Sequence, residues 1–173
     1  VHDPDAHEAE ALSTAFPALL ELREQGVIGK VGCGMNQVAM LARFVERVDL
    51  DCILLAGRFT LLDRSGTALL AQCAARGVEV IAGGVFNSGL LATPVTGATF
   101  DYAAAPAELV VRAQRLQTVC EQFGVPLPAA ALQFVSRDGT NIVDYVEPPV
   151  SSCYYPLLDV GERLAQNLVK AVE

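Results

Sequence analysis

The residues best suited to chemistry lie in a glycine-bearing loop in the middle of the chain. A short apolar run rich in β-branched residues, beginning at Gly77, opens into this loop. Such a run is typical of a buried parallel strand, and α/β proteins place ligand sites where these strands end. Glycine lets a ligand approach the backbone, and free N–H groups there favour an anion such as phosphate. The loop therefore predicts an anion site, with a mobile surface turn as the alternative. Its residues are Gly83, Gly84, Val85, Phe86, Asn87, Ser88, Gly89 and Leu90.

The elements that must position this loop follow a repeated order of strand, loop and helix. Apolar spacing predicts strands over 27–33, 52–55 and 142–146, besides the run after Gly77 and a strand end at Val1-His2. Helices are expected over 11–25, 38–47, 66–76, 107–123, 129–135 and 160–172, with a long loop over 94–106. Ser13 or Thr14 is expected to cap the first helix. Pro17 is compatible with this helix only if it lies in the first turn. Leu41, Phe44, Val45 and Val48 are expected to form the apolar face of the second helix.

This alternation predicts an α/β protein with a parallel sheet and outer helices, as one domain over residues 1–173. A doubly wound open sheet and a (β/α)8 barrel both fit the order of elements. The Gly-x-Gly-x-x-Gly fingerprint of dinucleotide folds is missing, since Gly32-x-Gly34 has no third glycine. A complete barrel needs eight strands in about 250 residues. The sequence is therefore interpreted as the second half of such a barrel.

Composition narrows the class of protein. The chain is 52% hydrophobic and 18% charged, which indicates strands buried on both faces or a surface that packs on something else. A net charge of -8 without a basic cluster argues against nucleic acid and anionic membrane surfaces, and no apolar run is long enough for a membrane span. The scattered cysteines indicate reduced thiols in a cytoplasmic protein, and they disfavour a metal site or a disulfide framework. They are Cys33, Cys52, Cys73, Cys120 and Cys153.

Three ordered stretches together resemble the aldo-keto reductase superfamily, in its branch of sugar and pyridoxal dehydrogenases. The first is Val1-His2-Asp3-Pro4-Asp5, and the second is Gly29-Lys30-Val31-Gly32-Cys33-Gly34-Met35-Asn36-Gln37. The third joins Ala56-Gly57-Arg58-Phe59-Thr60-Leu61-Leu62-Asp63 to the glycine loop. The likeness runs to about Ser136, lapses over 138–159 and returns at Glu162. It covers the C-terminal half of that family's barrel.

The resemblance implies roles for residues at the ends of two strands. His2 is similar to the histidine that hydrogen-bonds the substrate carbonyl, where a neutral imidazole stabilises charge developing on the oxygen. Met35 and Asn36 match the family's contact to the nicotinamide carboxamide. The asparagine side chain offers a donor and an acceptor together, which suits an amide ligand. The alternative for Asn36 is a helix N-cap, and both roles can hold at once. A glutamine that makes a second carboxamide contact in most of the family is replaced here by Ala56.

The resemblance also implies the rest of a track for NADP or NAD. The residues of the glycine loop would hold the cofactor pyrophosphate through their N–H groups and Ser88. Arg163, Gln166 and Asn167 match the adenosine end, where arginine can pair with a 2′-phosphate. For Arg163 a solvated helix face is the alternative.

Two departures limit what the resemblance predicts. The turn before Glu162 lacks the family's small-residue pattern, so the chain departs from the family where the family recognises phosphate. The family's Asp, Tyr and Lys belong to its N-terminal half, and no tyrosine or lysine of this sequence matches them. We therefore expect hydride transfer to a small carbonyl or sugar substrate, with little turnover by this chain alone. A non-catalytic half-barrel that self-associates is the alternative, and an unrelated phosphate-binding α/β enzyme is a third.

Overall fold

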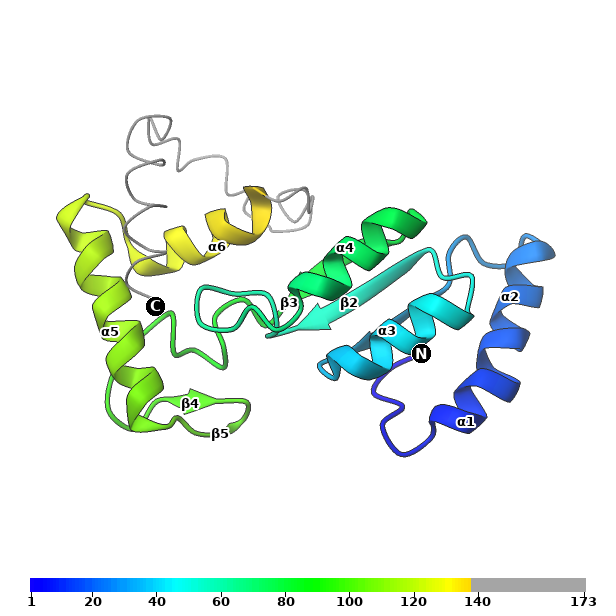
Figure 1. Cartoon of the computed structure of the whole chain (residues 1–173), viewed down its shortest axis with the longest axis horizontal. Helices are drawn as coiled ribbons and strands as arrows, with labels where there is room; N and C mark the ends of the chain where they lie inside the picture. The colour runs from blue at the N-terminus through cyan, green and yellow to red at the C-terminus, as the bar shows by residue number, and fades with distance from the viewer. Residues whose placement is uncertain (138–173) are drawn as a thin grey trace. The chain divides into compact units, whose positions relative to one another are not determined.

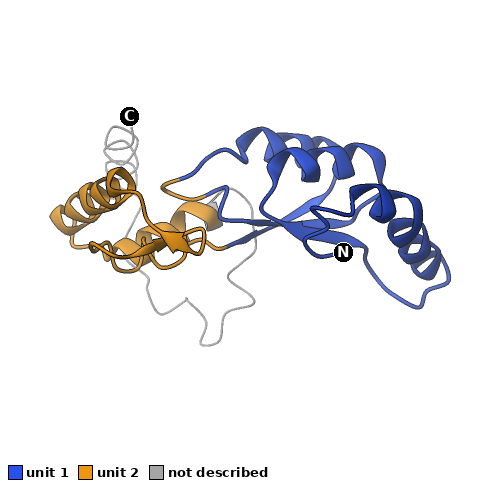
Figure 2. Ribbon diagram, turned by 90° about the horizontal axis from the view of Figure 1, so that it is seen from below, with its two compact units in different colours: residues 1–59, 63–83 blue, residues 60–62, 84–173 orange. Residues whose placement is uncertain are grey.

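A computed structural model describes residues 1–137, which form two compact units (Figure 1, Figure 2). Unit 1 comprises residues 1–59 and 63–83, and unit 2 comprises residues 60–62 together with the described residues from 84 to 137. Each unit has its own set of elements. The strand expected over 142–146 and the helix expected over 160–172 lie outside the described residues.

Unit 1 is built on a parallel sheet whose strands follow the chain order. The strands are β1 (Gly32–Met35), β2 (Cys52–Ala56) and β3 (Glu79–Gly83), in the order β1-β2-β3. A parallel bridge between His2 and Gly34 extends this order on the far side of β1. A doubly wound sheet reverses its strand order between its two halves, whereas a barrel adds neighbouring strands in sequence. The observed order is that of consecutive barrel strands.

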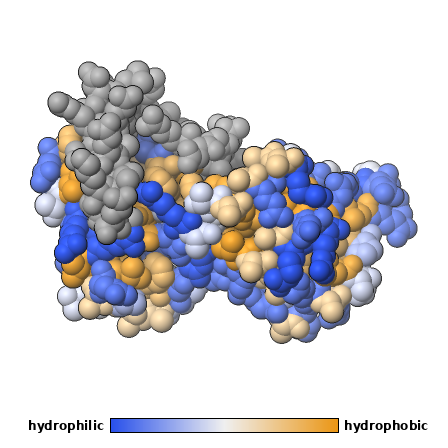
Figure 3. Space-filling view, viewed as in Figure 1, coloured by the Kyte–Doolittle hydropathy of each residue, from blue (hydrophilic) through white to orange (hydrophobic). Residues whose placement is uncertain are grey.

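The helices of unit 1 lie on one side of the sheet (Figure 2). They are α1 (Glu8–Glu10), the π-helical turn η1 (Ala11–Ala15), α2 (Phe16–Glu24), α3 (Val38–Arg47) and α4 (Thr67–Arg76). Ile53 and Leu55 on the helix side are 0% and 1% exposed, while Leu54 on the other side is 39% exposed and Ile81 is 48% exposed. The expectation that the strands are buried on both faces is therefore wrong for the described residues, because helices cover only one face. The helix-covered side in Figure 3 mixes hydrophilic and hydrophobic residues.

The predicted amphipathic helix over 38–47 is confirmed as α3. Its expected apolar face is buried, and all four residues belong to the core: Leu41, Phe44, Val45 and Val48. The ring of Phe44 meets the ring of Phe16 edge-on, with centroids 5.1 Å apart and planes at 64°. This aromatic pair joins α2 to α3.

The first helical segment begins earlier than predicted. It starts at Glu8, widens into η1 and continues as α2, in which Pro17 occupies the first turn. Ser13 and Thr14 lie inside η1, with their hydroxyl oxygens 3.4 Å apart, so the prediction that either one caps the helix is wrong. Proline cannot donate the hydrogen bond that a regular turn needs, and the wider π turn precedes it directly.

The strand predicted over 27–33 is shifted toward the C-terminus. Val27 is 65% exposed, and β1 begins only at Gly32. A Cβ at Gly32 would lie 2.7 Å from both the carbonyl oxygen and the Sγ of Cys52, so the close pairing of β1 with β2 requires glycine there. The prediction from apolar content placed the start of the strand too early, because the pairing of β1 with β2 determines where the strand starts.

Unit 2 contains the glycine loop from Gly84 onward, a small hairpin and two helices. The hairpin strands β4 (Thr99–Phe100) and β5 (Ala103–Ala104) are antiparallel, and α5 (Ala107–Gln122) packs with α6 (Leu127–Arg137). The helices predicted over 107–123 and 129–135 are confirmed, but the loop expected over 94–106 contains this hairpin. Asp101 and Tyr102 form its turn with φ of 49° and 64°. The turn lacks the Asn-Gly pair that would have signalled it in the sequence.

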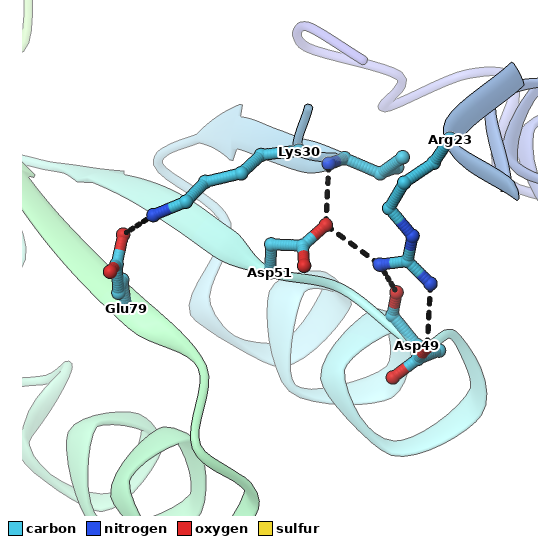
Figure 4. A network of polar contacts seen from close by, with 6 residues as sticks. Arg23, Lys30, Asp49, Asp51 and Glu79 are labelled. Carbon is cyan, nitrogen blue, oxygen red and sulfur yellow. Dashed lines mark hydrogen bonds and ion pairs between the residues drawn. The ribbon is translucent and has the colours of Figure 1, made fainter. Parts of the chain in front are cut away.

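A network of charges ties the amino ends of the strands in unit 1 (Figure 4). The Arg23 guanidinium bonds Asp51 Oδ2 at 2.7 Å and Asp49 Oδ2 at 2.6 Å. Asp51 Oδ2 also accepts the backbone N–H of Val31 at 2.6 Å, and Lys30 pairs with Glu79. The Val31 N–H and then Arg23 hold the pKa of Asp51 below its ordinary value. This end of the sheet is built for stability, since parallel α/β proteins carry their sites at the opposite end.

Among residues 1–137 the four cysteines are free thiols, and no group of His, Cys, Asp and Glu is arranged to hold a metal ion. No helix in this part of the chain is both long and apolar enough to cross a membrane.

Candidate functional site

The candidate site residues of unit 1 meet at the carboxyl edge of its sheet. His2 pairs beside β1, Asn36 follows the last residue of β1, and Gly83 is the last residue of β3. Parallel register places Met35 beside Leu55 and Ala56 beside Gly83. Because the strands are parallel, these residues share one edge.

Asn36 presents an amide that no other described residue engages. Its side chain is half-buried and makes no hydrogen bond with the described residues. The helix N-cap is Gln37, with no side-chain capping bond, so the alternative role of Asn36 as the cap is not what this structure shows. The Asn36 amide is therefore able to offer both its donor and its acceptor to a ligand.

Met35 has a different environment from Asn36. It is 2% exposed and belongs to the core on the helix side of the sheet. A ligand at this edge would therefore meet the backbone of Met35 rather than its thioether.

His2 lies on the uncovered side of the sheet. A Cβ placed on Gly34 would be 3.8 Å from His2 Cδ2 and 3.4 Å from the Cβ of Leu54, so these residues share one face. The His2 imidazole is 86% exposed, with Nδ1 3.5 Å from Asp3 Oδ2. The Asp3 N–H donates to the Gly34 carbonyl at 2.9 Å and fixes the backbone beside His2. The imidazole is therefore held at the edge by its backbone while its ring stays accessible.

Arg58 is a residue at this edge that the sequence analysis did not select. It lies just beyond the end of β2, and its Nε donates to the Asn36 carbonyl oxygen at 3.2 Å. Its Nη1 lies 3.4 Å from Asp63 Oδ2, with side-chain exposures of 18% for Arg58 and 23% for Asp63. A charged residue two positions after the end of a strand was the available signal. Arg58 lies in the stretch from Ala56 to Asp63, which was interpreted only as part of the family resemblance.

The part of the glycine loop in unit 2, with the following Leu91, uses several of its N–H groups to hold its own shape. Asn87, Gly89, Leu90 and Leu91 donate to carbonyls within the loop, at 2.9 to 3.2 Å. The N–H groups left without a partner among residues 1–137 belong to Gly84, Val85, Phe86 and Ser88. An anion at this loop would have to use these groups, which narrows the predicted set of backbone donors.

Asn87 supports the loop from within. It is 2% exposed, and its Oδ1 accepts a 2.7 Å hydrogen bond from the hydroxyl of Thr60. Thr60 Oγ1 in turn accepts the N–H of Leu62 at 3.1 Å. The Asn87 side chain is therefore engaged in the core of unit 2, and so is Leu90, which is 0% exposed.

Ser88 is exposed and connects the loop to the hairpin. Its Oγ accepts the N–H of Tyr102 at 3.2 Å, and its carbonyl accepts the Thr99 hydroxyl at 2.8 Å. The hydroxyl proton of Ser88 remains available to a ligand. Beside it lies an open hollow of about 430 Å³ lined by Ser88, Gly89, Ala92, Thr93 and residues 95–99. The residues expected at the adenosine end, Arg163, Gln166 and Asn167, lie outside the described part of the chain.

Comparison with known proteins identifies the family. The model of the aldo/keto reductase family matches residues 1–152. This chain belongs to the aldo/keto reductase family. The resemblance seen in the sequence is confirmed.

Two relatives of known name are similar to this aldo/keto reductase chain. A D-threo-aldose 1-dehydrogenase from Pseudomonas sp. is 43% identical over 138 residues, which cover 78% of this chain and 42% of the relative. A pyridoxal 4-dehydrogenase from Microbacterium luteolum is 48% identical over 124 residues, which cover 70% of this chain and 36% of the relative. The matched part of the chain thus spans about two fifths of the length of these relatives.

Among solved structures, a glycerol dehydrogenase from Gluconobacter oxydans resembles the chain with a TM-score of 0.54 and 17% identity. The match covers 80% of this chain and 45% of that one. At this identity the match shows the fold alone. The predicted fold, the C-terminal half of a (β/α)8 barrel, is confirmed.

Proposed function

We propose that this chain carries the nicotinamide end of the cofactor site of an NAD(P)-dependent oxidoreductase, which transfers hydride between the nicotinamide and a small carbonyl or sugar. The observation that carries the proposal is the half-buried, unengaged amide of Asn36 at the carboxyl edge that His2 shares. The names of the two dehydrogenase relatives support an oxidoreductase with an aldose-like or pyridoxal-like carbonyl substrate.

Asn36 and His2 of unit 1 would have different roles at this edge of the sheet. The amide oxygen of Asn36 accepts a hydrogen bond from the carboxamide of the nicotinamide, and its NH2 group donates one, which sets the rotation of the ring. The imidazole of His2 donates to the substrate oxygen and stabilises the negative charge that develops there. NAD or NADP supplies the hydride chemistry when bound.

The glycine loop of unit 2 is proposed on its own local geometry as the pyrophosphate site. The free N–H groups of Val85, Phe86 and Ser88, with the Ser88 hydroxyl, are donors of the kind that phosphate oxygens accept. The proposed cofactor is NADP or NAD, and the proposed location is the cytoplasm, which fits the free thiols.

Titration of NADPH and NADH fluorescence against the wild-type chain and the Asn36→Ala variant tests the nicotinamide site. We expect saturable binding by the wild type, and an affinity about tenfold weaker for the variant, because two hydrogen bonds to the carboxamide are lost. Gln37→Ala is the matched control, since Gln37 is exposed and makes no side-chain capping bond. Equal affinity of the wild type and Asn36→Ala would contradict the proposed role of Asn36.

A self-associating, non-catalytic half-barrel remains the second candidate function. Leu54 and Ile81 favour it, because both are large apolar residues exposed on the uncovered face of the sheet. Sedimentation of the chain with and without NADPH separates the two proposals. Oligomers that bind no cofactor would support the half-barrel, and saturable cofactor binding would support the oxidoreductase.

A further inference from the structure

Arg58 occupies a particular place relative to the proposed nicotinamide contact. β1 and β2 are parallel neighbours; Asn36 directly follows β1, and Arg58 lies two residues beyond the last residue of β2. Its guanidinium reaches across this edge, and Nε donates to the Asn36 carbonyl at 3.2 Å. The bond ends on the backbone of the very residue whose amide is offered to the ligand.

The loop that carries Arg58 is itself fixed. The Arg58 carbonyl accepts the N–H of Gly66 at 2.7 Å, and a Cβ on Gly66 would lie 2.8 Å from that carbonyl oxygen. Only glycine permits this close approach, and it closes the loop of residues 58–66. The backbone from which the Arg58 side chain extends is therefore held in place.

A charge holds the other end of the guanidinium. Nη1 lies 3.4 Å from Asp63 Oδ2, and Asp63 Oδ1 accepts the N–H of Ser65 at 2.8 Å. Both side chains of the Arg58–Asp63 pair are mostly buried, so solvent screens it less than a surface ion pair. A planar guanidinium anchored at Nη1 holds its Nε donor in a fixed direction.

We propose that Arg58 is a positioning residue that fixes the backbone of Asn36 and thereby the direction of its amide toward the nicotinamide carboxamide. Arg58 acts through Asn36. This inference rests on the proposed function, and it adds a residue whose effect is confined to the nicotinamide end of the ligand.

Because the expected effect is limited to the nicotinamide end of the ligand, a ligand with nicotinamide and one without it should respond differently to the variant. Arg58→Met removes the donors and keeps much of the stem. We expect about fivefold weaker binding of NADPH, as for the loss of one hydrogen bond, and unchanged binding of 2′-phospho-ADP-ribose, which lacks the nicotinamide ring. If the wild type prefers NADH, then NADH and ADP-ribose are the matched pair. Arg76→Met, at the exposed end of α4, is the control and should change neither affinity.

A double-mutant cycle separates positioning from a general structural role. In the Asn36→Ala background, Arg58→Met should weaken NADPH binding no further, because the amide that it orients is gone. Asp63→Asn keeps the arginine and removes its anchoring charge, and should weaken NADPH binding about twofold. It provides the same comparison if Arg58→Met does not fold.

Several results would overturn the inference. One is that Arg58→Met weakens the binding of NADPH and of 2′-phospho-ADP-ribose equally. Another is that its effect on NADPH affinity adds fully to that of Asn36→Ala. A third is that neither Arg58→Met nor Asp63→Asn changes NADPH affinity. If the wild type binds and Asn36→Ala weakens binding while Arg58→Met does not, only this inference fails. If the wild-type chain binds neither NADPH nor NADH, the proposed function fails and this inference fails with it.

Discussion

Asn36 shows at the scale of single residues how a side chain is left available for a ligand. Its neighbour Gln37 takes the N-cap position, Met35 is buried on the helix side, and Arg58 bonds the Asn36 carbonyl. All these contacts fix the backbone, and none of them engages the amide. Asn36 and His2 could be found in the sequence because both match motifs of the family that the chain resembles. Arg58 lies in another such stretch, but its role could not be predicted because its partner is a backbone carbonyl 22 residues away, which no local spacing reveals.

The buried thiols of Cys33 and Cys120 give a prediction at the same scale. Burial raises the pKa of each thiol to about 11, so at pH 8 roughly one in a thousand is ionised. We expect both to react with a disulfide reagent only after denaturation. Peptide mapping of the labelled chain at pH 8 checks this, with fully denatured protein as the control. Rapid labelling of Cys33 or Cys120 in the folded chain would show that they are not buried as described.

Asp51 links sheet stability to pH at the scale of elements. Its folded-state pKa is depressed, so its stabilisation is present above the unfolded pKa, near 4, and is lost as pH falls through the folded value. Asp51→Asn should therefore lower the free energy of unfolding by about 1 kcal/mol at pH 7. The difference from wild type should close as the pH falls below about 4 and through the folded-state value.

Urea unfolding across this pH range measures the effect of Asp51→Asn. Asp5→Asn is the control, because Asp5 is exposed and lies outside the charge network. A difference between Asp51→Asn and wild type that stays constant from pH 7 to pH 2 would contradict the assigned role of the Asp51 carboxylate.

The hairpin of unit 2 gives a second prediction at the scale of elements. Asp101 and Tyr102 both have positive φ, which costs conformational energy for residues with a Cβ. Replacing the pair by Asn-Gly, which this two-residue turn prefers, should raise the free energy of unfolding by about 1 kcal/mol. Thermal unfolding checks it, and Ala103→Gly, within β5, serves as a control that should destabilise. A lower melting temperature for the Asn-Gly variant would count against the turn described.

Helices and strands could be predicted from the sequence where local apolar spacing determines them, and not where contacts between distant residues or unusual backbone turns do. Helix α3 was predicted with its residue bounds because its apolar spacing coincides with its buried face. The start of β1 was misplaced because the contact between Gly32 and Cys52, not hydrophobicity, decides it. The π turn before Pro17 and the Asp101–Tyr102 turn were missed because each departs from the usual local signal.

At the scale of the whole chain, the family and the one-sided burial of the sheet belong together. A barrel strand has one face toward the helices and one toward the barrel interior. In unit 1 the helix side is core, whereas Leu54 and Ile81 on the other side are exposed. The matched part of the chain spans about two fifths of the length of its dehydrogenase relatives. The second of the two interpretations of the apolar composition, a surface that packs on something else, stays a prediction, and these two exposed apolar residues are consistent with it.

The central claim is that the carboxyl edge of unit 1 binds nicotinamide through Asn36. Two-dimensional ¹H–¹⁵N NMR of the labelled chain, titrated with NADP⁺ and then NAD⁺, tests it most directly. The account predicts saturable shifts of the Asn36 side-chain NH2 resonances, assigned by their loss in Asn36→Ala, with smaller shifts when 2′-phospho-ADP-ribose replaces NADP⁺. Saturable binding that leaves the Asn36 amide resonances unmoved, or no binding of either cofactor, would contradict it.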